Sequence, residues 1–67
     1  MNKLYSISEL SNLLYKKAQK DQALNPMARA YGSMEGFLHS VIDYSDSLSS
    51  IRKQINEKCI ELEKELA

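Results

Sequence analysis

The chain has 67 residues, and its nine basic and nine acidic side chains cancel to a net charge of zero. This length allows one domain at most, and a core of this size supplies only a few kcal/mol of net stability. The single cysteine excludes a disulfide within the chain, and one histidine with one cysteine offers too few ligands for a structural metal. We therefore expect residues 1–67 to form one domain without metal or cofactor. Such a domain is stabilised either by oligomerisation or by an unusually well-packed bundle.

Charge and hydropathy argue against two classes of partner. No basic stripe is present to neutralise a run of phosphates, so we expect no binding to duplex nucleic acid. No apolar run approaches the roughly 20 residues that span a bilayer, so we expect no membrane partner. The N-terminal residues also lack the apolar stretch of a signal peptide. Together with the lone cysteine, these features predict a cytoplasmic protein.

No segment alternates apolar and polar residues as a half-buried strand does, so the predicted fold class is all-α. Ser6 and Glu9 have the spacing of a capping box, in which each side chain accepts a hydrogen bond at the start of a helix. The apolar residues that follow share one helical face: Ile7, Leu10, Leu14 and Ala18. We predict a first helix over residues 7–23 and a turn at residues 24–25.

Asn25 and Pro26 predict the start of a second helix, because asparagine is a good N-cap and proline suits the first helical position. Beyond them, apolar residues recur every seven positions, as in the a/d seam of a coiled coil. The first series is Met27, Met34, Val41, Leu48, Ile55 and Leu62. The companion series is Tyr31, Leu38, Ser45, Arg52, Cys59 and Leu66. We predict that the apolar members of this seam, from Met27 to Leu62, form the interface of a homo-oligomer.

Two architectures fit this pattern. In the first, residues 26–65 form one long helix, and the first helix folds back on it as a hairpin with a coiled-coil tail. In the second, the serine-rich stretch from Ser45 to Ser50 is a turn, and three helices form a bundle, because serine and aspartate favour caps and turns. The seven-residue phase continues through this stretch without a glycine or proline, which favours the long helix.

A stripe of small residues runs along the second helix at a spacing of four: Ala28, Gly32, Gly36 and Ser40. Each glycine inside a helix costs about 1 kcal/mol relative to alanine, so two of them need an offset. We expect the first helix, or the same helix of a second copy, to pack closely on this stripe.

The alternative is that the stripe is the floor of a ligand site, with Arg29, Tyr31 and His39 as contacts. Tyrosine stacks on an aromatic base, and arginine pairs with a phosphate through charge-assisted hydrogen bonds. Carboxylates border this floor and repel an anion. An anionic ligand would therefore also need lysines of the first helix above it, such as Lys16, Lys17 or Lys20.

Glu35, His39 and Asp43 are spaced by four and share one face. We interpret them as a solvated polar face rather than a metal or acid–base site, because such charge patterns usually solvate a helix. No nucleophile is paired with the one histidine at a recognisable spacing, and no phosphate-binding loop is present. We therefore expect no enzymatic activity.

A short helical chain with a Gly32-x-x-x-Gly36 step in a core helix resembles the small accessory proteins of phages. Some of that group inhibit host defence, either by blocking a host protein or by sequestering a signalling nucleotide in an oligomer. The resemblance implies a place in the host cytoplasm and assigns no functional residue. We predict a non-enzymatic homo-oligomer that blocks or scaffolds another protein, with sequestration of a small anionic nucleotide as the alternative.

Overall fold

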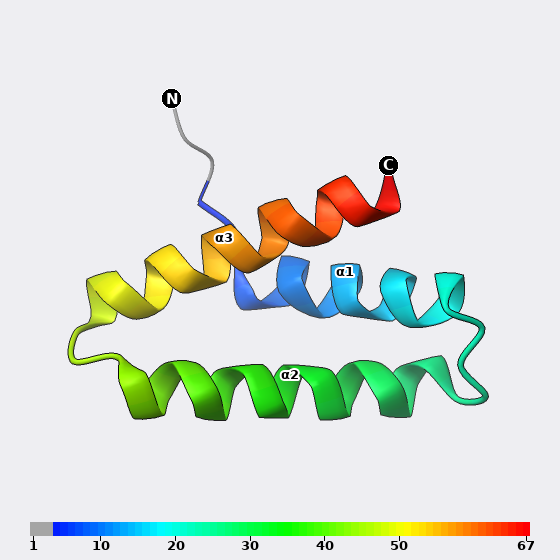
Figure 1. The fold of residues 1–67 in the computed structure, drawn as a ribbon, viewed down its shortest axis with the longest axis horizontal. Helices are drawn as coiled ribbons and strands as arrows, with labels where there is room; N and C mark the ends of the chain where they lie inside the picture. The colour runs from blue at the N-terminus through cyan, green and yellow to red at the C-terminus, as the bar shows by residue number, and fades with distance from the viewer. Residues whose placement is uncertain (1–3) are drawn as a thin grey trace.

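The computed structural model describes residues 4–67 and contains three helices, α1 (Ile7–Lys20), α2 (Pro26–Tyr44) and α3 (Leu48–Leu66). No strand occurs in this range, which confirms the all-α prediction. The chain runs along α1, returns antiparallel along α2, and then follows α3 in the direction of α1 (Figure 1). Residues 1–3, part of the stretch in which we expect no signal peptide, lie outside the described residues.

Helix α1 begins with the predicted capping box. The backbone N–H of Glu9 donates to Ser6 Oγ at 3.1 Å, and the backbone N–H of Ser6 donates to Glu9 Oε1 at 3.3 Å. These bonds satisfy donors that the first turn of a helix otherwise leaves free. Ile7 stays about half exposed, whereas the rest of the predicted apolar face is buried: Leu10, Leu14 and Ala18.

Helix α1 ends at Lys20, three residues before the predicted end. The backbone N–H of Gln22 donates to Gln19 O and that of Ala23 donates to Ala18 O, both at 3.0 Å. This pair of bonds is a Schellman motif, and Gln22 has the left-handed φ of 60° that the motif requires. Glycine usually occupies this position, so the helix end carried no recognisable sequence signal.

Helix α2 begins at Pro26, as predicted. The side chain of Asn25 accepts a hydrogen bond from the backbone N–H of Ala28 at 3.1 Å. The N-cap therefore compensates one of the unpaired donors of the first turn, and proline at the first position has no donor to lose.

The prediction of one continuous helix over residues 26–65 is wrong, because α2 ends at Tyr44 and α3 begins at Leu48. The break covers residues 45–47, the first half of the stretch that the three-helix alternative made a turn, while residues 48–50 already belong to α3. The seven-residue phase crosses the break because α2 and α3 each contribute apolar residues to the chain's own core. The spacing of seven between Val41 and Leu48 therefore does not reflect one helix.

Serine side chains account for the break. The backbone of Ser45 is extended, with φ −110° and ψ 132°, and its Oγ accepts a hydrogen bond from Gln54 Nε2 at 3.1 Å. Ser47 is the N-cap of α3, and its Oγ accepts from the backbone N–H of Ser50 at 3.2 Å. The bond of Ser47 is a local side-chain–backbone bond, which offers the backbone an alternative to continued helix, whereas the bond of Ser45 ties the turn to α3.

Helix α1 is the central element, because it packs against both other helices, which contact each other little (Figure 1). The shortest dimension of the molecule is 16 Å, not much more than the ~10–12 Å diameter of one helix. Helix α2 therefore keeps much of its surface exposed. The buried apolar cluster draws on all three helices: Leu10, Leu14, Ala30, Ile55, Cys59 and Leu62.

Tyr5, which precedes the N-cap of α1, is tied to α3. The backbone N–H of Tyr5 donates to Asn56 Oδ1 at 2.8 Å, and its phenol donates to the carboxylate of Glu63. At the other end of α1, Lys20 Nζ donates to the backbone carbonyl of Glu65. These contacts anchor both ends of α1 to the part of α3 between Asn56 and Glu65.

Candidate functional site

One face of α2 presents large apolar side chains that no other part of the described chain covers. Met27 is 74% exposed, Tyr31 72% and Ile42 61%, and Leu38 between them is half-buried. Their spacings of four, seven and four place them on one side of the helix. We call these four residues the α2 stripe. The stripe is symmetric about its midpoint, since Met27 and Ile42 are equally distant from it, as are Tyr31 and Leu38.

A groove of about 570 Å³ between α1 and α2 adjoins the N-terminal half of the stripe. Helix α1 contributes Ser11, Asn12 and Tyr15 to it, and α2 contributes Met27, Tyr31 and Met34, among others. The α2 stripe is thus continued by a partly apolar depression rather than by a polar rim. Contiguous exposed apolar surface of this kind is typical of an interaction site.

The predicted seam divides into two parts. Ile55, Cys59 and Leu62 are buried within the chain, where α3 packs on α1, and Val41 of α2 is buried as well. These four side chains already have neighbours and are absent from the surface that a second copy would meet. Members of the seam that remain accessible are Met27, Tyr31, Met34, Leu38 and Leu48.

The stripe of small residues is not packed by another helix of the chain. A Cβ added at Gly32 or Gly36 would meet nothing within 4 Å, and Ala28 and Ser40 are exposed. The expectation that α1 packs there is therefore wrong, because α1 lies against a different face of α2. Glu35, His39 and Asp43 are exposed beside the stripe, and residues 4–67 contain no group of three or more side chains able to hold a metal.

A cavity of about 440 Å³ lies where the three helices meet, and we call it the three-helix cavity. Its apolar wall includes Leu14, Ala18, Phe37 and Leu62. Its polar lining comes from all three helices: Lys17 and Asp21 of α1, Arg29, Ser33 and Ser40 of α2, and Lys58 and Glu65 of α3. Three of the residues predicted for a ligand site line this cavity: the contact Arg29, the floor residue Ser40 and the overlying lysine Lys17. Tyr31 and His39 do not line this cavity.

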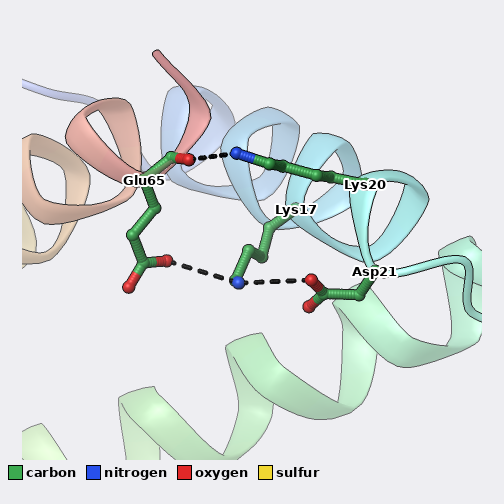
Figure 2. A network of polar contacts seen from close by, with 4 residues as sticks. All are labelled: Lys17, Lys20, Asp21 and Glu65. Carbon is green, nitrogen blue, oxygen red and sulfur yellow. Dashed lines mark hydrogen bonds and ion pairs between the residues drawn. The ribbon is translucent and has the colours of Figure 1, made fainter.

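One lysine holds both carboxylates of the cavity (Figure 2). Lys17 Nζ lies 3.3 Å from Asp21 Oδ1 and 3.6 Å from Glu65 Oε2. The hydrogen bond to Asp21 and its charge, followed by the charge of Glu65, raise the pKa of Lys17 above its ordinary value of 10.5. Each carboxylate is therefore already engaged by a cation.

A third apolar feature lies where α1 and α3 begin, and we call it the end hollow. It encloses about 370 Å³. Leu4 and Leu48 are mostly exposed at its edge and Ile7 about half exposed, while Ile51 and Ile55 lie deeper. The sequence did not indicate Ile42 as part of the α2 stripe or Lys58 as part of the three-helix cavity, and it did not indicate the end hollow. Ile42 follows Leu38 by four residues, a signal available from a helical projection.

In residues 4–67, no helix combines the length and apolar character needed to cross a bilayer. No protein-family model matches the chain, and neither a curated protein nor a solved structure matches it significantly.

Proposed function

We propose that this chain is a non-enzymatic binding protein that self-associates through the α2 stripe and, in that form, blocks or scaffolds another protein. The observation that carries the proposal is the exposure of three large apolar side chains along one face of α2. The core leaves this face uncovered, and a partner helix would remove it from water.

A second copy is the occupant that the pattern of the stripe favours. In an antiparallel pair of α2 helices, Met27 of one copy would face Ile42 of the other, and Tyr31 would face Leu38. Every apolar residue then meets an apolar residue, as a twofold interface requires. The chain carries no net charge that would drive two copies apart.

The strength of such a pair follows from the exposed fractions. Full burial of a large apolar side chain contributes about 1.5–3 kcal/mol. Weighted by exposure, Met27, Tyr31 and Ile42 offer about 3–6 kcal/mol per copy, or about 6–12 kcal/mol per pair. Association costs at least about 4 kcal/mol. The dissociation constant should therefore be no tighter than about 1 μM.

Sedimentation equilibrium between about 10 μM and 1 mM, a range chosen around that limit, tests the self-association. Tyr31→Lys and Ile42→Lys should each give a monomer, because an unpaired charge would be buried in the pair. Ile60→Lys is the matched control, since Ile60 is also an exposed isoleucine but lies on α3. A wild-type chain that is monomeric throughout, or variants that sediment like the wild type, would contradict the proposal.

A substitution that strengthens self-association gives a second test of the antiparallel pair. The midpoint of the stripe falls between Met34 and Glu35, so the two copies would bring two carboxylates close to the twofold axis. Glu35→Gln should tighten the pair, by up to about tenfold at low salt and less at physiological ionic strength. An unchanged dissociation constant at low salt would argue against the antiparallel arrangement.

The end hollow is the surface we propose for the other protein, because it stays free when α2 is paired. Following the resemblance to phage accessory proteins, a host defence protein is the first partner to test. Leu48→Lys should abolish recovery of that partner by a tagged chain, while the Ile60→Lys control should recover it in the wild-type ratio. Equal recovery of the partner by both variants would show that the end hollow is not the contact surface.

A further inference from the structure

Two cations of the three-helix cavity make no ion pair within the described chain. Arg29 and Lys58 line its wall from α2 and α3. Neither side chain makes an ion pair or hydrogen bond with another of residues 4–67. Lys17, by contrast, already holds both carboxylates. Among the charged lining residues, three are cationic and two anionic, so the cavity has an excess of one positive charge in a chain that is neutral overall.

The remaining lining defines the chemistry that would fit. Ser33 and Ser40 add hydroxyl groups that can donate to an anion, and Phe37 gives an aromatic surface beside the aliphatic wall. A volume of about 440 Å³ lies within the range of about 300–1,000 Å³ typical of small-molecule sites, which combine an apolar lining with a few polar groups. The ligand should therefore have one anionic group and a flat apolar body.

We propose that the three-helix cavity binds a small organic phosphate of the nucleoside monophosphate class. Arg29 and Lys58 hold the phosphate, Arg29 through the paired N–H groups that match phosphate oxygens. The serine hydroxyls add hydrogen bonds, and the base packs on Phe37. This site does not depend on the pairing of α2, because none of its lining residues belongs to the α2 stripe.

The position differs from the ligand floor considered in the sequence. That floor consisted of the small residues on α2, where the structure shows open space around both glycines. The cavity shares with that arrangement Arg29 as a contact, Ser40 as a floor residue and Lys17 as an overlying lysine. The sequence-based prediction placed the second cation on α1, whereas in the cavity the second unpaired cation is Lys58 of α3.

Titration calorimetry with AMP, adenosine and inorganic phosphate as separate probes tests the proposal at low salt. AMP should bind the wild-type chain, and adenosine and inorganic phosphate should each bind at least about tenfold more weakly. Arg29→Gln and Lys58→Gln should each weaken AMP binding by about tenfold or more, because each removes a charge-assisted contact. Added salt should weaken it further.

Two controls separate this site from general charge and from self-association. Lys64→Gln removes an exposed cation of α3 that lies outside the cavity, and it should leave AMP binding unchanged. Ile42→Lys should also leave it unchanged. Absence of AMP binding, or equal binding by Arg29→Gln, Lys58→Gln and the wild type, would overturn the proposal. Adenosine binding as tight as AMP would exclude the phosphate contact, and inorganic phosphate binding as tight as AMP would exclude the role of the aromatic wall.

Discussion

A proline at position 48 tests whether the chain breaks between α2 and α3. Leu48 is the first residue of α3, where a backbone N–H has no helical partner. The first backbone bond of the new helix runs from Ile51 N to Ser47 O, at 3.2 Å. Ser47, with φ −151° and ψ 156°, has the extended backbone that a residue before proline adopts. Leu48→Pro therefore removes no hydrogen bond and imposes no backbone change.

The expected change in unfolding free energy is close to zero. Leu48 is 64% exposed, so the loss of its buried part costs about 0.5–1 kcal/mol. The stiffer unfolded chain returns about 0.4–1 kcal/mol. In a continuous helix the same proline would cost about 3 kcal/mol or more, which is a large part of the roughly 3–10 kcal/mol expected for a chain of this length.

Urea denaturation followed by circular dichroism measures the difference. Lys53→Pro is the matched control, because Lys53 is an exposed residue in the interior of α3. This variant should lose about 3 kcal/mol or more of unfolding free energy. Leu48→Pro should unfold within about 1 kcal/mol of the wild type. Equal destabilisation by both prolines would refute the break and restore the long helix.

Three further predictions concern α1 and its ends. Leu10→Ala should lower the unfolding free energy by about 2–5 kcal/mol, because Leu10 is fully buried at the centre of the core, whereas Leu24→Ala should change it by less than about 0.5 kcal/mol. Gln22→Gly should raise the melting temperature, since glycine relieves a left-handed φ that costs about 1–2 kcal/mol, although its greater freedom when unfolded offsets part of the gain. The raised pKa of Lys17 means that its ion pairs stabilise the fold fully below pH 10.5 and are lost as the pH rises through that raised value. The alkaline decline in stability should therefore be shallower in Lys17→Gln, as measured by thermal denaturation between pH 9 and 12.

The starts of α1 and α2 could be predicted because they rest on local chemistry. Ser6 with Glu9, and Asn25 with Pro26, form their hydrogen bonds within four residues, so the spacing alone specifies them. The end of α1 has the same kind of local motif but uses Gln22 in place of glycine. Its left-handed backbone is imposed by the turn and leaves no trace in residue type.

The sequence could not decide between the break and one long helix, and it could not locate the cavity, because both depend on contacts between helices. Ser45 is held by Gln54 of the following helix, and a heptad pattern cannot show whether its two halves face one neighbour or two. The three-helix cavity joins Arg29 and Lys58, which lie 29 positions apart in the sequence. Only the packing of α2 and α3 on α1 brings both residues to one cavity.

Because Cys59 is buried between α1 and α3, the labelling rate of the chain's only thiol reports how fast that interface opens. A reagent such as a disulfide dye reacts only when α3 leaves α1, so the labelling rate at high reagent concentration equals the opening rate. Because α3 contacts α2 little, its departure need not unfold the α1–α2 hairpin. Labelling faster than global unfolding would show that α3 detaches as a separate cooperative unit, whereas equal rates would show that the three helices open together.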